Sequence, residues 1–301
     1  MLAIETKQLS KSFWKNNVVK KIDLQVEKGE ILGFLGRNGA GKSTFINMLT
    51  GIIRPTSGSY ALLGKQGPND AIKKEIGVMP DYSSLYGSMT AIKHLSYLAA
   101  VSQKPVTRLR CMEVLKLVGL EEHANKKAAK FSFGMKKKLA IAQAIIHDPQ
   151  LIFLDEPTSG LDAESVIHIH HLIQHLHEQG KTIFMTSHNL DEVEKICNRI
   201  AIMKDGKIKK SGTMDELRAY YQSTITVTVR HSPIQAADKS TIEKWLAKTG
   251  TQLEMEASQF TIQVESEQKI AEITRALGTY KIDIYRVDVD EPSLEEIFLE
   301  E

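Results

Sequence analysis

The chain has 301 residues, of which 42% are hydrophobic and 25% are charged, and this ordinary composition predicts a globular protein. That length is long for a single compact core, so a large domain and a small one are expected. The 39 basic and 37 acidic side chains nearly cancel, which argues against a nucleic acid held mainly through its phosphate charge.

The cysteines and the apolar runs indicate where the chain acts. Cys111 and Cys197 are too few for a disulfide framework and fit a reduced cytosolic compartment. No apolar run approaches the roughly 20 residues that cross a bilayer. The N-terminal residues 1–13 alternate polar and apolar side chains, unlike a signal peptide. Any role at a membrane is therefore expected to depend on a partner chain.

The first part of the sequence reads as short strands and helices, the pattern of an α/β fold. The predicted elements are antiparallel strands at 2–9 and 18–26, a strand at 30–35, a helix at 42–49, buried parallel strands at 151–154 and 182–186 with a helix at 163–179 between them, and a hairpin at 201–203 and 207–209.

After about residue 221 the pattern becomes βαββαβ, which is typical of a small ferredoxin-like α+β domain. Its predicted elements are a strand at 224–230, a helix at 239–248, strands at 253–256 and 260–265, a helix at 267–277 and a strand at 280–289. A last short helix is predicted from Pro292, with a capping box of Ser293 and Glu296. We place the two domains at residues 1–215 and 222–301.

A glycine-rich loop between the strand at 30–35 and the helix at 42–49 matches the pattern G-x-x-x-x-G-K-S/T. Its glycines let backbone amides approach phosphate oxygens, and the helix N-terminus that follows favours an anion. Lys42 is expected to reach the β- and γ-phosphates of ATP, and the Ser43 hydroxyl to ligate Mg²⁺. The residues predicted to bind nucleotide are Gly36, Arg37, Asn38, Gly39, Ala40, Gly41, Lys42, Ser43 and Thr44.

A second acidic motif stands where the apolar strand at 151–154 ends. Phosphoryl transfer needs one carboxylate to hold magnesium and another group to position or deprotonate the attacking water. Asp155 suits the first role and Glu156 the second. Beside a phosphate-binding loop, this pair predicts ATP hydrolysis.

Three further motifs accompany these two in a fixed order. The segment 131–135 (Phe-Ser-Phe-Gly-Met) is similar to an LSGGQ signature, the segment 159–162 (Ser-Gly-Leu-Asp) to a D-loop, and His188 to a switch histidine. The whole set resembles the ATPase subunit of ABC transporters over residues 2–212. The resemblance implies a P-loop NTPase cassette with an antiparallel β subdomain and a helical signature subdomain.

The resemblance also implies a composite site, because two such domains dimerise head to tail. Ser132, Gly134 and Asp162 would then contribute to the nucleotide site of the other subunit, and a helix at 135–147 would point its N-terminus at the γ-phosphate. His188 would hold that phosphate together with Glu156 and keep the attacking water in line.

Three motifs depart from the family pattern or leave a choice open: the Q-loop, the adenine-stacking position and the signature. Asp81 stands at the Q-loop position in place of glutamine, where it would approach the magnesium ion. Phe13 stands at the position of the aromatic residue that stacks on adenine, with Trp14 beside it as the alternative. In the signature, Phe133 replaces the usual first glycine and Met135 the usual glutamine.

The resemblance implies a second nucleotide-binding subunit, identical or related, and a separate transmembrane permease subunit. This chain would then be cytoplasmic and peripheral on the inner face of the cell membrane. The signature and the tail at 292–298 resemble those of antibiotic and multidrug exporters, which favours export of drug-like, antibiotic or lipid-like substrates. The alternatives are a soluble ABC ATPase of translation or DNA repair, and an importer subunit. The C-terminal domain is expected to regulate or stabilise the dimer, the alternative being a passive appendage.

Two clusters outside these motifs have competing interpretations. His168, His171 and His175 share one helix face, as a three-histidine metal site would require, but no carboxylate or cysteine completes the set. A solvated polar face beside the apolar stripe is the favoured interpretation. The lysine run at 136–138 is likewise interpreted as a solvated helix face and not as an anion-binding patch.

Overall fold

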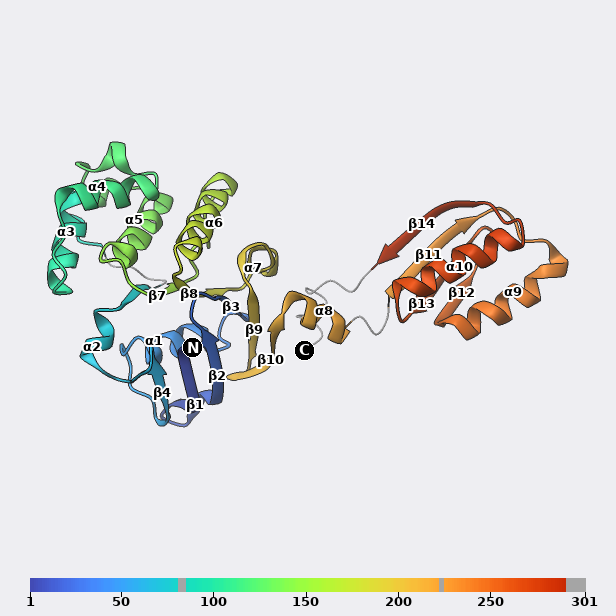
Figure 1. The fold of residues 1–301 in the computed structure, drawn as a ribbon, viewed down its shortest axis with the longest axis horizontal. Coiled ribbons are helices and arrows are strands. Elements are labelled where there is room, and N and C mark those ends of the chain that lie inside the picture. The colour runs from blue at the N-terminus through green and yellow to red at the C-terminus, as the bar shows by residue number, and fades with distance from the viewer. Residues whose placement is uncertain (81–84, 222–224, 291–301) are drawn as a thin grey trace. The chain divides into compact units, whose positions relative to one another are not determined.

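The computed structural model describes residues 1–80, 85–221 and 225–290. The chain forms two compact units, Met1–Met214 and Asp215–Glu301. Figure 1 labels the helices and strands of both units.

A six-stranded sheet forms the centre of the first unit. Its strands, in spatial order, are β10 (Lys207–Thr213), β9 (Arg199–Lys204), β3 (Ile31–Leu35), β8 (Thr182–Ser187), β7 (Leu151–Asp155) and β6 (Ile76–Met79). All neighbours are parallel except the β9–β10 pair, which forms the predicted hairpin. β3, β7 and β8 are buried along their whole length, which explains why each contains a run of apolar residues.

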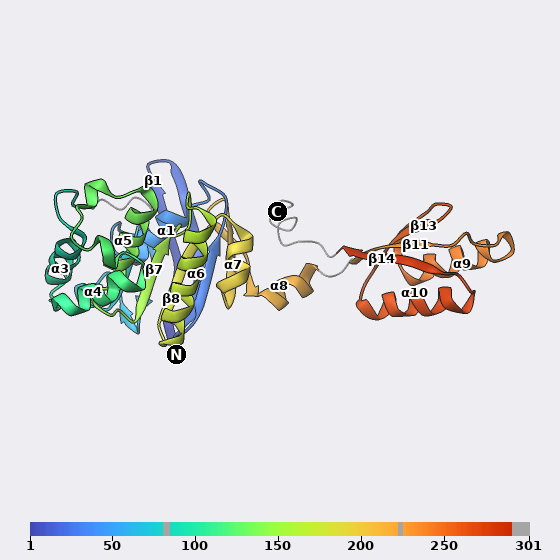
Figure 2. The same ribbon diagram turned by 90° about the horizontal axis from the view of Figure 1, so that it is seen from above.

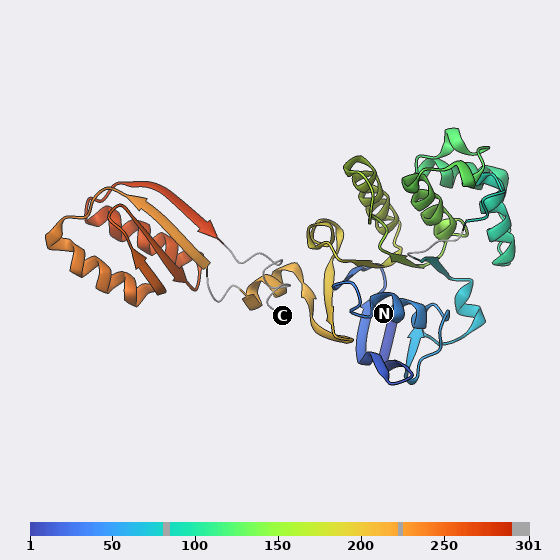
Figure 3. The ribbon, with the colours of Figure 1, turned by 180° about the vertical axis from the view of Figure 1, so that it is seen from behind.

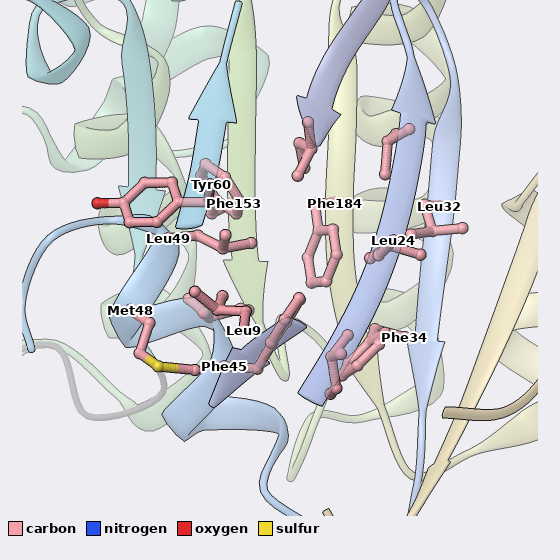
Figure 4. Close-up of a cluster of buried hydrophobic side chains, with 14 of the residues drawn as sticks. Leu9, Leu24, Leu32, Phe34, Phe45, Met48, Leu49, Tyr60, Phe153 and Phe184 are labelled. Atoms are coloured by element: carbon pink, nitrogen blue, oxygen red, sulfur yellow. The ribbon is translucent and has the colours of Figure 1, made fainter. Parts of the chain in front are cut away.

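A second, antiparallel sheet accounts for the alternating N-terminal segments. It contains β2 (Asn16–Glu27), β1 (Leu2–Phe13), β4 (Ser57–Leu62) and β5 (Lys65–Gln66), in that spatial order. Both N-terminal strands are longer than predicted. The sheet and α1 (Lys42–Leu49) share one core with the central sheet (Figure 4). Within that core the ring of Phe34 lies 5.1 Å from that of Phe45 and 5.3 Å from that of Phe184, between centroids.

Three helices pack against strands of the central sheet: α5 (Phe133–Ile145) against β6 and β7, α6 (Ala163–Glu178) against β8, and α7 (Leu190–Ile196) against β3 (Figure 2). The approach of α7 is close. A Cβ atom added at Gly33 would lie 2.2 Å from Val193 Cγ1 and 2.9 Å from Cys197 Sγ, so only glycine fits there. The Cys197 thiol is consequently buried.

The remaining helices of this unit complete the helical subdomain that the family resemblance implied. α3 (Ala91–Val101), α4 (Arg108–Leu117) and α5 contact one another, and Cys111 is buried in α4. The smaller helical pieces are α2 (Asp70–Lys73), two 3₁₀ turns at Glu121–His123 and Ala128–Lys130, and α8 (Met214–Tyr221), which begins where the first unit ends.

The second unit has the predicted βαββαβ order: β11 (Ile225–His231), α9 (Ala236–Thr249), β12 (Thr251–Met255), β13 (Gln259–Val264), α10 (Glu267–Thr279) and β14 (Ile284–Asp290). Its antiparallel sheet runs β12-β13-β11-β14, and the two helices pack against it around an apolar core (Figure 3). β14 begins later than predicted because α10 continues to Thr279. The helix predicted from Pro292 lies outside the described residues.

Candidate nucleotide-binding site

The glycine-rich loop connects β3 to α1, as the sequence predicts. Gly41 caps the helix with a φ of 108°, and a Cβ atom there would lie 2.9 Å from the Val18 carbonyl oxygen. Only glycine satisfies both conditions. The loop encloses a cavity of about 280 Å³. Its lining consists of Val18, Arg37, Asn38, Gly39, Gly41, Lys42, Ser43, Thr44 and Glu156.

Lys42 and Glu156 face each other in this cavity, and both side chains are almost completely buried. Lys42 Nζ donates to the Gly36 carbonyl oxygen at 2.6 Å and lies 3.2 Å from Glu156 Oε1. That carboxylate oxygen has no hydrogen-bond partner among the described residues. A buried acceptor next to a lysine in a phosphate-binding loop is suited to a water molecule held close to a phosphate group.

The backbone of Glu156 is held in an unusual conformation directly after β7. Its φ of 51° lies in the left-handed region, which non-glycine residues rarely adopt. Its N–H donates to Thr186 Oγ1 at 3.0 Å, and the Thr186 hydroxyl in turn donates to Asp155 Oδ1 at 2.5 Å. Asp155 and Thr186 are register partners on the neighbouring strands β7 and β8. Thr186 therefore connects the two carboxylate residues.

Sequence reasoning did not assign a function to Thr186. The available signal was a hydroxyl that follows the apolar run at 183–185, two residues before the predicted switch histidine. That histidine, His188, places Nδ1 2.8 Å from Glu156 Oε2, and its side chain is 47% exposed. The parallel order β3-β8-β7 thus brings Lys42, Glu156 and His188 together from three distant parts of the chain.

The signature segment lies against the D-loop segment. Ser132 caps α5 by accepting a hydrogen bond from the Met135 N–H at 3.3 Å, so the helix begins at Phe133, two residues earlier than predicted. A Cβ atom on Gly160, whose φ is 75°, would lie 3.0 Å from the Phe133 ring. One on Gly134 would lie 3.4 Å from Leu161 Cδ2.

Asp162 and the signature residues occupy positions outside the lining of the cavity. Asp162 caps α6 by accepting from the Ser165 N–H at 2.9 Å, and this hydrogen bond lowers the pKa of the carboxyl group. Among the described residues, the lining includes none of Ser132, Gly134 and Asp162.

Of the remaining predicted residues, Phe13 ends β1 with 43% of its surface exposed, and Lys11 Nζ lies 4.9 Å from the centre of its ring. Trp14 follows in the turn and is fully exposed. Both aromatic faces remain candidates for stacking on adenine. Asp81 lies outside the described residues.

The histidine and lysine clusters each had two competing interpretations in the sequence. His168 Nε2 bonds to the Leu117 carbonyl oxygen at 3.2 Å, and the described residues contain no cluster of three metal-ligating side chains. The lysine run was interpreted wrongly at one position. Lys137 is buried, with 6% of its surface exposed, because it lies on the apolar face of α5.

In the described parts of the chain, no helix has the length and apolarity of a membrane span.

Comparison with known proteins identifies two family matches. The family described as ABC transporter matches residues 19–159, and the family described as the C-terminal domain of DrrA1-3-like ATP-binding proteins matches residues 212–301.

Individual relatives match nearly the whole chain. The linearmycin resistance ATP-binding protein LnrL of Bacillus subtilis is 33% identical, over 98% of this chain and 97% of its own length. The bacitracin transport ATP-binding protein BcrA of Enterococcus faecalis is 32% identical, over 98% of this chain and 94% of its own length.

A solved structure resembles the first unit's fold. The dimeric structure of the ATP-binding cassette MJ0796, bound to ADP and Pi after hydrolysis, is 26% identical with a TM-score of 0.66, over 70% of this chain and 98% of that one.

Proposed function

We propose that this chain, which belongs to the family of ABC transporter ATP-binding proteins, powers a bacterial exporter of antibiotic-like compounds. The observation that carries the proposal is the likeness to LnrL and BcrA over nearly the whole chain, named for linearmycin resistance and bacitracin transport. The match of residues 212–301 to the DrrA1-3-like C-terminal domain supports it as well.

The phosphates of ATP bind in the loop cavity. The backbone amides of the loop and the N-terminus of α1 favour the phosphate charge. Lys42 Nζ, now between the Gly36 carbonyl and Glu156, contacts the β- and γ-phosphates. Phe13 or Trp14 stacks on the adenine ring.

Mg²⁺ fits the same cavity by the chemistry of its oxygen donors. The Ser43 hydroxyl lines the cavity, and the Asp155 carboxylate stands at the end of β7, next to Glu156. Hydroxyl and carboxylate oxygens are ligands that Mg²⁺ accepts, directly or through water. When bound, the ion neutralises charge that develops on the phosphate oxygens. Asp81 is a further proposed ligand.

Glu156 acts on the attacking water. Glu156 lines the cavity, and its Oε1, which lies 3.2 Å from Lys42 Nζ, has no hydrogen-bond partner in the described chain, so it can accept a proton or hydrogen bond from water. His188 holds Oε2 through its Nδ1 and so fixes the orientation of the carboxylate. Thr186 holds the Glu156 N–H from the other side. These contacts position the water in line with the γ-phosphate.

A second subunit completes the site. Ser132 and Gly134 at the start of α5, together with Asp162 at the start of α6, contact the nucleotide of the partner across a head-to-tail dimer. The N-terminus of α5 then faces an anion. The dimer binds at the inner face of the membrane to a transmembrane permease subunit, which uses the ATP-dependent closing and opening of the dimer. The C-terminal unit regulates or stabilises the dimer.

Purification from the source bacterium tests the transport partner. The full chain, carrying an affinity tag, is isolated from detergent-solubilised membranes, and the proteins bound to it are identified by mass spectrometry. We expect a membrane protein with six predicted spans. Recovery of no such protein, with the ATPase intact, would contradict the permease assignment.

Drug sensitivity tests the direction of transport. Deletion of the gene should make the cells more sensitive to antibiotics such as linearmycin or bacitracin, for which the relatives are named. The wild-type gene, but not the Glu156→Gln variant, should restore resistance. Unchanged antibiotic sensitivity combined with loss of growth on a specific nutrient would instead indicate an importer.

A further inference from the structure

The buried lysine of the signature helix contacts the backbone of the carboxylate residue. Lys137 lies in α5, 6% exposed, and its Nζ donates to the Glu156 carbonyl oxygen at 2.6 Å. A lysine ammonium group is rarely buried, because removing it from water costs free energy. A neutral side chain of the same length would fill the space without that cost. The position of Lys137 therefore points to a specific role for its charge.

The residue whose carbonyl oxygen Lys137 contacts, Glu156, is the one with the left-handed backbone conformation. A left-handed conformation, such as the φ of 51° at Glu156, is unfavourable for a non-glycine residue and persists only when its surroundings impose it. At Glu156, one side chain forms a hydrogen bond with the backbone N–H and another with the backbone C=O. Thr186 accepts from its N–H, and Lys137 donates to its C=O. The two contacts come from β8 and α5, which lie on different parts of the chain.

The same helix connects this contact to the signature. Lys137 follows Phe133 by about one helical turn, and its Nζ lies 5.9 Å from the centre of the Phe133 ring. Ser132 caps the helix immediately before it. A shift of α5 along its axis would therefore displace the ammonium group relative to the Glu156 peptide.

We propose that Lys137 is a positioning residue for ATP hydrolysis, which holds the Glu156 peptide in its left-handed conformation and makes the placement of the carboxylate depend on the position of the signature helix. The inference rests on the proposed role of Glu156 as the group that acts on water. Lys137 does not contact the reacting atoms and acts through the backbone of Glu156.

The test compares steady-state ATP hydrolysis by the full chain and five variants. Lys137→Met removes the ammonium group and keeps the length of the side chain, whereas Lys137→Arg keeps a charged donor. Lys136→Met is the matched control, because it makes the same change at the preceding residue of α5, whose side chain is exposed. Glu156→Gln and its combination with Lys137→Met show whether the two residues act through one another.

We expect Lys137→Met to lower kcat by about tenfold or more, while KM and the affinity for an ATP analogue change by less than about twofold. Lys137→Arg should recover part of kcat, and Lys136→Met should behave as the wild type. In the Glu156→Gln background, Lys137→Met should produce almost no further loss.

Two results would overturn the role of Lys137. One is a wild-type kcat in Lys137→Met. The other is a decrease in kcat by the same factor when Lys137→Met is made in the wild-type chain and in the Glu156→Gln variant. If Lys137→Met does not fold, Lys137→Gln replaces it, since its side chain is neutral and too short to make the contact. A normal kcat in that variant is equally decisive. A Glu156→Gln variant that hydrolyses ATP at the normal rate would instead refute the proposed role of Glu156.

Discussion

Thr186 offers a sharp test of the site because one hydroxyl makes two contacts. It accepts from the Glu156 N–H and donates to Asp155 Oδ1, and it is fully buried. Replacement by valine keeps the shape of the side chain and removes both hydrogen bonds. The buried N–H and the carboxylate oxygen would each lose a partner.

The size of the effect follows from those two groups. An unsatisfied buried polar group costs about 1–3 kcal/mol, so the loss of a partner by two such groups in Thr186→Val should lower the free energy of unfolding by about 2–6 kcal/mol. Ordinary domains are stable by about 5–15 kcal/mol, so a loss in the lower part of this range leaves the domain folded. The Glu156 peptide also loses one of its two anchors, and kcat should fall between about tenfold and 100-fold because the water is misplaced.

Urea unfolding followed by circular dichroism measures the first effect, and steady-state ATP hydrolysis measures the second. Thr182→Val is the matched control on the same strand. Its hydroxyl accepts only from the Gly29 N–H in the hydrogen bonds described, away from the carboxylates, so the loss should be about 1 kcal/mol with kcat unchanged. If Thr186→Val is as stable and as active as Thr182→Val, the hydroxyl does not support Glu156.

Three further predictions concern the charged groups. Glu156→Gln should lower kcat by about 100-fold or more while an ATP analogue still binds, because the neutral amide cannot accept a proton; turnover near the wild-type rate would contradict this. Lys42→Ala should weaken binding of the ATP analogue by about tenfold or more, measured by equilibrium titration, because the contact between a buried cation and the phosphates is lost. An unchanged affinity would show that Lys42 does not contact the nucleotide. Burial lowers the pKa of His94, so the unfolded chain binds a proton first as the pH falls through about 6.5. The free energy of unfolding should therefore decrease from pH 7 to pH 5, and less steeply in His94→Gln; parallel pH profiles would refute the assignment.

Local motifs were predictable because their residues are close in sequence. The loop from Gly36 to Ser43 and the pair Asp155 and Glu156 each carry their own spacing, and the structure places the loop and Glu156 at one cavity. The alternation in the second unit likewise predicted its βαββαβ order. Its spatial strand order follows from long-range pairing, which alternation alone does not specify.

The supporting residues were harder to predict, since their roles depend on tertiary contacts. Lys137 was read as part of a solvated lysine run, although Lys137, Ala140, Ile141 and Ala144 follow helical spacing and are all buried. That spacing was the available signal. The left-handed φ of Glu156 has no signature in the sequence, because the hydrogen bonds that impose it come from β8 and α5.

The tight packing of α7 on β3 has a practical consequence for measuring the motions of the first unit. Its two thiols, in Cys111 and Cys197, are both buried, and burial raises the pKa of each, so the reactive thiolate is scarce in the folded chain. Alkylation then proceeds only through opening of the surrounding structure. Cys111 reports on the helical subdomain and Cys197 on the central sheet. The ratio of their labelling rates, with and without nucleotide, would show which part of the cassette ATP makes rigid.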